Sequence, residues 1–206
     1  MNTLVKQTWA GLRVLIALTI ILGIGYPLAV WTIARIPGLQ SNAEGSVVTQ
    51  NGQAVGSSLI GIDPVPADPA HDPWFHNRPS AGSKDSLGPG DPSTSGASNK
   101  GPFNEDLVKT ITERKDLIAK REGVAPDQVP ADAVTASGSG LDPSISVAYA
   151  DLQIARVARN TGLSEDKVRQ LVEANTTGAG IGVPGVNVLL LNLAVHSAAP
   201  GAQGAH

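Results

Sequence analysis

The sequence predicts an α+β protein in which one N-terminal transmembrane helix is followed by a small extracytoplasmic α+β domain. Three observations support this fold class. An uncharged apolar stretch near the N-terminus is long enough to cross a membrane, an Asn-Gly pair between two β-prone runs marks a hairpin, and capping residues flank later helical patterns. We expect the domain to contain about three helices, the β-hairpin and a C-terminal buried strand.

The composition limits both the core and the chemistry of the chain. Once the apolar stretch and its flanks are set aside, roughly 160 of the 206 residues remain, which fits one domain. Only 3% of the residues are aromatic, so the core is modest and we expect a partner to add rigidity. The net charge of -3 gives no basic surface for nucleic acid. There are no cysteines, which excludes disulfides, thiolate nucleophiles, iron–sulfur clusters and Cys-ligated zinc.

Residues 14–34 are predicted to form the transmembrane helix. No charged residue lies between Arg13 and Arg35, and a helix of this length rises about 31 Å, close to a hydrocarbon core of about 30 Å. Trp31 suits the membrane–water interface. The stretch is therefore expected to lie in a membrane, in contact with lipid.

The charges beside this span predict its direction. Two basic side chains, Lys6 and Arg13, precede the span, and only one follows it closely. The positive-inside bias therefore favours a cytoplasmic tail at residues 1–13 and an extracytoplasmic domain at residues 35–196. Residues 197–206 are expected to form a flexible tail.

A cleaved signal peptide is the alternative interpretation of the apolar stretch. Ser41-Asn42-Ala43 offers small residues at the positions that a signal peptidase reads, and Pro37 could end the helix before them. A cleavable apolar region usually runs about 7–15 residues, which is shorter than this stretch. A retained anchor is therefore favoured.

The span contains features that allow contact with another helix. Gly25 and Ala29 form a small-xxx-small pair, across which a second helix can approach closely. Pro27 lies between them and is expected to bend the helix locally. Glycine and proline are common in membrane helices, so a role without a protein contact stays open.

Two contrasting segments follow the span. Residues 46–62 are predicted to form a β-hairpin, because Asn51-Gly52 supplies the positive φ angles of a type I′ turn. Residues 63–103 form a long Pro/Gly/Ser segment, but Trp74-Phe75-His76 and Arg78 are anchors that a disordered linker seldom carries. We therefore predict an ordered surface loop that forms part of a binding face.

Three helices are predicted from their caps and apolar stripes. The first covers residues 104–121, with Asn104 as its N-cap and Gly123 just past its end. The second covers residues 146–160, and the third begins after Ser164.

Two further segments are predicted as strands. Val134-Thr135 is expected to start a short strand that runs into the turn at residues 137–143. Residues 186–195 are nearly all apolar and follow Pro184-Gly185, which predicts a buried C-terminal strand.

The polar residues form no catalytic or metal-binding pattern. His71 and His76 stand five residues apart in a Pro-containing loop, a spacing without particular metal geometry, and we predict no metal site. The glycines and serines of residues 137–140 do not form a G-x-S-x-G elbow, and the chain has no phosphate-binding glycine motif. We therefore predict an accessory protein without catalytic residues.

Several motifs occur in the order typical of one family. Residues 75–81 (FHNRPSA) resemble the F-H-x-R-P-S-A segment of the C chain of bacterial potassium-transporting P-type ATPases (KdpC). Residues 94–102 resemble its S-G-x-S-N-x-G-P loop, and residues 130–143 resemble its longest signature. Further motifs follow in family order at Leu152-Gln153, Arg156-Val157-Ala158 and residues 186–194. With the N-terminal anchor, the resemblance covers nearly the whole chain.

The chain departs from the pattern of that family at three places. Ser144 stands where His is usual, and Lys100 replaces a commonly apolar residue. Val183-Pro184-Gly185 stands where Gly-Glu-Pro-Arg is usual. The loss of this acidic and basic pair puts in question any ion pair or partner contact that the family makes there.

The resemblance implies an accessory subunit of a high-affinity, ATP-driven potassium import complex in the bacterial inner membrane. The implied partners are a channel-like subunit that binds K⁺ and a P-type subunit that hydrolyses ATP, so no cofactor is expected on this chain. The family is described as necessary for assembly and activity and as raising the ATP affinity of the catalytic subunit. Because ATP is cytoplasmic and the domain is expected outside, we expect coupling through the membrane helix.

The expected partner contacts lie on the span and on three loops. They are Gly25 and Ala29 on the span, Trp74, Phe75, His76 and Arg78 on the first loop, Ser95 and Asn99 on the second, and Asp142 on the third. The alternative for each loop residue is a structural role, with Arg78 bonding carbonyl groups and Asn99 capping a turn. The rival function is a membrane-tethered extracytoplasmic hydrolase that uses a loop serine with His76.

Overall fold

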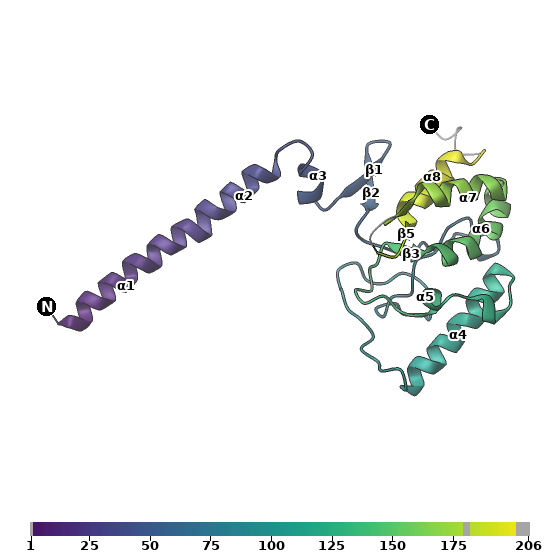
Figure 1. Cartoon of the computed structure of the whole chain (residues 1–206), viewed down its shortest axis with the longest axis horizontal. Helices are drawn as coiled ribbons and strands as arrows, with labels where there is room; N and C mark the ends of the chain where they lie inside the picture. The colour runs from purple at the N-terminus through teal and green to yellow at the C-terminus, as the bar shows by residue number, and fades with distance from the viewer. Residues whose placement is uncertain (1, 179–181, 201–206) are drawn as a thin grey trace. The chain divides into compact units, whose positions relative to one another are not determined.

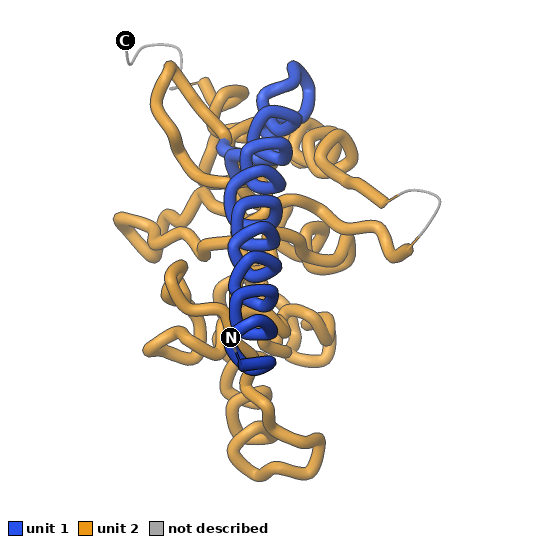
Figure 2. Tube along the Cα trace, turned by 90° about the vertical axis from the view of Figure 1, so that its left-hand side faces the viewer, with its two compact units in different colours: residues 1–47 blue, residues 48–206 orange. Residues whose placement is uncertain are grey.

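The computed structural model describes residues 2–178 and 182–200. The chain divides into two compact units, residues 1–47 and residues 48–206, which Figure 2 colours separately. The first unit is helical, and the second contains both helices and strands (Figure 1). The mixed fold class predicted from the sequence is therefore confirmed.

The first unit is dominated by one long helix. It consists of α1 (Thr3–Ile20), a π-helical turn (Ile21–Gly25) and α2 (Tyr26–Ala34), and the short α3 (Gln40–Ala43) follows. The 32 residues Thr3–Ala34 have a mean hydropathy of 2.2 over their most apolar window, and none of that window is buried. This helix is long and apolar enough to cross a membrane. A signal sequence meets the same criteria, so the cleaved alternative stays open.

The helix changes its hydrogen-bond pattern next to Pro27. Proline has no backbone N–H, and its ring clashes with the carbonyl group four residues earlier, here that of Gly23. Gly23 lies within the π-helical turn Ile21–Gly25, which widens the ladder at that point. The structure thus shows an altered hydrogen-bond pattern in the turn before Pro27, and the predicted bend of the helix axis stays a prediction.

The predicted β-hairpin is confirmed over residues 47–57, but residues 58–62, which were predicted to belong to it, lie beyond its second strand. β1 (Val47–Gln50) and β2 (Gln53–Ser57) form a two-stranded sheet. The turn residues Asn51 and Gly52 have φ angles of 52° and 77°, the positive values that a type I′ turn requires.

The three predicted helices of the second unit are confirmed as α4 (Glu105–Glu122), α6 (Val147–Thr161) and α7 (Glu165–Ala174). Each has a side-chain N-cap, and the three capping residues are Asn104, Ser146 and Ser164. Gly123 and Gly162 end α4 and α6 in the left-handed conformation. The signals that place these helices are local, which is why the sequence predicts them well.

The predicted C-terminal strand is largely wrong. Only β5 (Gly185–Asn187) is extended, and α8 (Val188–Ala198) follows it directly. The Asn187 side chain accepts a hydrogen bond from the Leu190 amide at 3.1 Å and so caps the helix. A continuous apolar run fits a buried strand and a buried helix equally well, so the pattern alone does not choose between them. The last predicted segment, residues 197–206, begins inside this helix and ends outside the described residues.

The predicted strand at Val134-Thr135 is also wrong, because α5 (Ala131–Val134) occupies that place. The strand lies further along the chain, at β3 (Ser144–Ser146). It pairs antiparallel with β5, and β5 also pairs antiparallel with β4 (Thr176–Thr177). The sheet order is therefore β3-β5-β4, with Ile145 opposite Val186.

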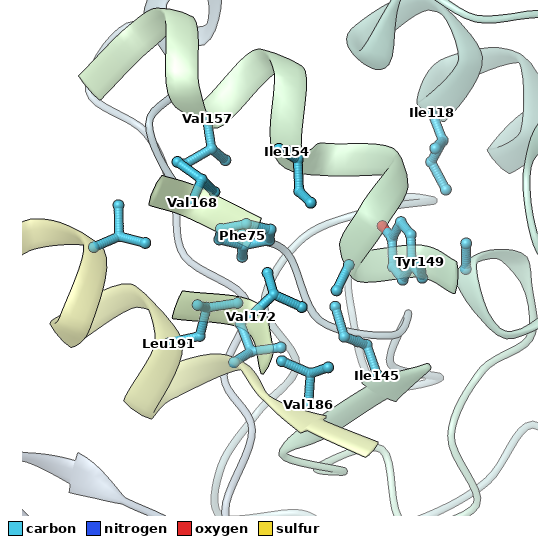
Figure 3. Packing of buried hydrophobic residues seen from close by; sticks show 14 of the residues in the cluster. Phe75, Ile118, Ile145, Tyr149, Ile154, Val157, Val168, Val172, Val186 and Leu191 are labelled. Carbon is cyan, nitrogen blue, oxygen red and sulfur yellow. The ribbon is translucent and has the colours of Figure 1, made fainter. Parts of the chain in front are cut away.

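The core of the second unit forms where its helices meet this small sheet. Figure 3 shows the Phe75 ring in the middle of the buried cluster, with Val157, Val168 and Val172 around it. Phe75 comes from the segment 63–103, in which the only helical turn is the 3-10 turn Pro69–His71 and no strand is present among these described residues. The irregular segment thus supplies a central core residue.

Three loops cross in close contact beside the core. The Ser137 amide donates to the Pro79 carbonyl at 3.0 Å, and the Gly96 amide donates to the Ser139 carbonyl at 2.8 Å. Gly140 has a φ angle of +72°, and a Cβ atom there would lie 2.9 Å from the Gly96 carbonyl oxygen. Only glycine combines that conformation with so close an approach.

We expect Gly140→Ala to destabilise the chain by about 2 kcal/mol or more, because the new methyl group meets backbone at a strained φ angle. Urea unfolding of the purified chain measures the change. Gly138→Ala is the matched control, since a Cβ at Gly138 meets no atom within 4 Å. The control is expected to change stability by less than about 0.5 kcal/mol. Equal effects of the two substitutions would contradict this description of the crossing.

Candidate functional site

The segment 72–80 runs through the interior of the second unit. Phe75 has no exposed area, and His76 is 4% exposed. The prediction of a surface loop is therefore wrong for these two side chains. The reason is that buried side chains satisfy the backbone of the segment. Asn192 accepts a hydrogen bond from the Phe75 amide and Gln153 accepts one from the His76 amide, both at 2.8 Å.

His76 lies between two carboxylates. Its Nε2 atom is 2.6 Å from Asp72 Oδ2, and its Nδ1 atom is 3.1 Å from both carboxylate oxygens of Asp63. An ionised carboxylate offers only acceptor oxygens, so each of these contacts can be a hydrogen bond that a ring nitrogen donates. Each ring nitrogen of His76 thus lies within hydrogen-bonding distance of a carboxylate, which holds the ring between Asp63 and Asp72.

Arg156 on α6 connects this histidine to the helices. One of its Nη atoms lies 3.2 Å from the Asp72 carboxylate and donates to the carbonyl groups of Asp72 and Trp74, both at 2.9 Å. Its Nε atom donates to Glu122 on α4 at 2.9 Å. The Arg156 side chain is 3% exposed, and its bonds join the irregular segment to two helices.

Arg121 completes the charged group at the end of α4. It donates to Glu122 at 2.7 Å and to the Tyr149 hydroxyl at 3.0 Å. Burial raises the pKa of Tyr149 to about 12, although the positive charge of Arg121 acts in the opposite direction. The tyrosine hydroxyl therefore stays neutral and accepts the Arg121 hydrogen bond.

The carboxylates of this buried network all have basic partners. The carboxylates are Asp63, Asp72 and Glu122, and the basic side chains that contact them are His76, Arg121 and Arg156. Burial by itself raises the pKa of Asp72, but the hydrogen bond and charge of His76 and the charge of Arg156 outweigh it and lower that pKa. Paired and hydrogen-bonded charges are the form in which ionised groups are tolerated inside a protein.

Gln153 on α6 provides the uncharged part of the network. Its side chain accepts from the His76 amide and from Arg156, and it donates to the carbonyl groups of His76 and Tyr149 at 3.3 Å. The residues of this network other than His76 were not among the predicted site residues. One signal could have indicated Gln153 and Arg156, because they lie on the apolar face of α6 that Tyr149 and Val157 define.

The other predicted loop residues lie nearer the surface. Arg78 pairs with Asp142 at 3.2 Å, and Ser95 donates to the Ser139 carbonyl at 3.1 Å, so these residues join neighbouring loops. Asn99 adopts a positive φ angle of 52° and donates to the Ala97 carbonyl within its own turn. Trp74 stacks on His196 of α8, with ring centroids 6.3 Å apart.

The arrangement indicates a structural site rather than a reaction centre. Among the described contacts, both ring nitrogens of His76 are directed to carboxylates, so the serine–histidine pair of the rival hydrolase is not formed there. A groove of about 770 Å³ lies over the network, lined by acidic and basic side chains that include Glu113 and Arg159. Among the residues that the structure describes, no group of three or more His, Cys, Asp or Glu side chains could hold a metal ion.

Comparisons with known proteins agree on one family. The family described as the c chain of the K⁺-transporting ATPase, KdpC, matches residues 8–197. A protein of Kineococcus radiotolerans named potassium-transporting ATPase KdpC subunit is 47% identical over 204 residues, covering 97% of this chain and 98% of that protein. A protein of the same name from Streptomyces avermitilis is 42% identical over 221 residues, covering 95% and 97%. One from Mycobacterium tuberculosis is 41% identical over 195 residues, covering 92% and 97%.

We expect Arg156→Met to destabilise the chain by about 3–5 kcal/mol, because it leaves Asp72 and Glu122 buried without their shared cation. Arg169→Met is the matched control. Arg169 lies 3.8 Å from Asp151 on the surface, where an ion pair contributes less than about 1 kcal/mol. Chemical unfolding of both variants measures the difference. If the two substitutions cost the same, Arg156 does not hold the network together.

The lowered pKa of Asp72 predicts an acid-sensitive contribution to stability. A carboxylate whose pKa is lower in the folded chain stabilises it above its ordinary value of 3.8, and this contribution is lost as the pH falls through the lowered pKa. We expect Asp72→Asn to be less stable at pH 7 and to lose stability less steeply below about pH 4. Unfolding free energies measured across this pH range test the prediction, with Asp127→Asn on the surface as the control. If the unfolding free energy of Asp72→Asn falls with pH as steeply as that of the unaltered chain, the prediction is wrong.

Proposed function

This chain belongs to the KdpC family, the c chains of K⁺-transporting ATPases, and we therefore propose that it is the accessory subunit of an ATP-driven potassium import complex. The family match over residues 8–197 carries the proposal. The proposed partners are a channel-like subunit that binds K⁺ and a P-type subunit that hydrolyses ATP. The chain would be required for assembly and activity of this complex.

Under this proposal, the partner subunits handle K⁺ and ATP. Two features of the second unit support that division. The buried acidic side chains are paired with basic side chains of the same domain, so they are not free to bind K⁺. Gln153 is fully buried and bonded within the domain, so it contributes to rigidity rather than to a ligand surface. We therefore assign to this domain a fixed surface for partners.

We further propose a single span with the N-terminus in the cytoplasm and residues 35–196 outside. Lys6 and Arg13 before the span support this direction. The span would then be the covalent link between the external domain and the cytoplasmic side. To shift the catalytic subunit toward its ATP-binding state, this chain must bind that state more tightly than the other states of the subunit. The small residues Gly25 and Ala29 are proposed as the contact points within the membrane.

The proposed contacts outside the membrane are the exposed or half-buried side chains among those predicted. These are Trp74, Arg78, Ser95, Asn99 and Asp142. Phe75 and His76 are assigned a different role, because they are buried and fix the shape of the segment on which Trp74 and Arg78 lie.

Copurification of the full chain from a membrane extract tests the function. We expect a tagged chain to capture a P-type ATPase and a channel-like protein, and deletion of the chain to abolish K⁺-stimulated ATP hydrolysis. Gly25→Leu is expected to reduce capture at least tenfold, since the larger side chain separates packed helices. Gly23→Leu is the matched control, since Gly23 lies two residues earlier in the same π-helical turn and helix periodicity places it on a different face. A pump that assembles and hydrolyses ATP equally well without this chain would refute the proposal.

A further inference from the structure

An apolar groove of about 350 Å³ lies between the β-hairpin and α8. Val55 of β2 and, in the residues that follow β2, Ile60 and Ile62 line the hairpin side of the groove. Leu189, Leu193 and Trp74 line the other side. The groove belongs entirely to the second unit. Two of these aliphatic side chains are partly open to solvent, with Val55 41% and Ile62 48% exposed. Because these exposed aliphatic side chains gather around one groove, the groove is a candidate docking surface.

The polar groups in the lining are already bonded within the domain. Asp63 faces His76 and accepts a hydrogen bond from the Asn77 amide at 2.7 Å. Asn192 bonds both the amide and the carbonyl group of Phe75. The groove therefore has few polar groups to offer a ligand, and its occupant must be apolar.

The segment that forms the hairpin side is also uncharged over its whole length. No Asp, Glu, Lys or Arg occurs in residues 45–62. The hairpin pairs with no strand of the other sheet, and a two-stranded hairpin alone is marginally stable. The hairpin approaches α8 closely, because a Cβ atom at Gly56 would lie 2.9 Å from Leu189 Cδ2. Just after the hairpin, the Ser58 carbonyl accepts a hydrogen bond from the Asn187 side chain at 2.8 Å. The hairpin is thus held against α8 with much of its apolar surface uncovered.

We propose that this groove receives an apolar protein segment from the extramembrane surface of a membrane-embedded partner subunit. The proposal rests on the proposed function, which places such a subunit in the complex. The linker between the candidate span and the hairpin supports it, since residues 35–46 extend at most about 40 Å. On the proposed topology the hairpin therefore begins no further than about 40 Å from the end of the span, a distance that the parts of an integral membrane partner outside the bilayer can also reach.

The charges favour a protein over a lipid surface as the occupant. Segments that lie on lipid combine an apolar face with Lys and Arg side chains that attract anionic headgroups. Here the uncharged run is bounded by two acidic residues, Glu44 and Asp63. Arg35, the basic residue at the end of the span, is paired with Glu44 at 2.6 Å. An apolar protein surface needs no such basic residues.

The absence of cysteine from the sequence makes a direct test possible, because Ile62→Cys becomes the single thiol of the full chain. We expect a maleimide to label this thiol at least tenfold more slowly in the purified pump than in the unassembled chain. Leu117→Cys on α4 is the matched control, since Leu117 is 43% exposed and lies outside the groove. Its labelling rate is expected to be unchanged by assembly. Ile60→Cys repeats the comparison if Ile62→Cys does not fold.

Each other outcome overturns the proposal. Equal labelling of Ile62→Cys in the pump and in the unassembled chain leaves the groove open, although the pump itself assembles. Protection in vesicles that contain this chain alone assigns the groove to lipid. Protection in detergent that grows with the concentration of this chain assigns it to a second copy. If no pump is captured at all, the proposed function fails first and this inference fails with it.

Discussion

The guanidinium group of Arg156 is the contact on which the rest of the second unit depends. It bonds the carbonyl groups of Asp72 and Trp74, and it pairs with the carboxylates of Asp72 and Glu122. In this way one side chain of α6 joins α4 to a segment that has almost no secondary structure of its own. Because the segment is held there, Phe75 reaches the centre of the core and His76 lies between Asp63 and Asp72.

This arrangement answers a problem that the composition poses. The chain has few aromatic residues and no disulfide, yet an irregular stretch of about forty residues has to keep one conformation. A buried ion network contributes little net stability compared with apolar packing, but a wrong arrangement leaves charges unpaired and is costly. The network therefore acts mainly by selecting one conformation of the segment. Arg114 contributes to the same selection, because it donates hydrogen bonds to the carbonyl groups of Ser86 and Val134. A domain fixed in this way can present a constant surface to partner subunits.

The sequence predicted those parts of the fold whose signals are local. Asn104, Ser164 and Gly162 mark helix ends through bonds to residues close in the chain, and Asn51-Gly52 defines its own turn. The helix α8 was missed because an apolar run does not distinguish a strand from a helix, and its cap, Asn187, was not recognised. The network was missed for a different reason. Arg156 and Asp72 are 84 residues apart, and only the tertiary fold brings them together.

Amide hydrogen exchange of the full chain tests most directly whether the network orders the irregular segment. The amides of Phe75 and His76 bond to buried side chains rather than to a helix or strand ladder. If the network holds, both amides exchange as slowly as those in the middle of α6, because only global opening releases them. If they exchange as fast as the exposed amides near Ser98, the segment opens by itself, and the fixed partner surface that we infer does not exist.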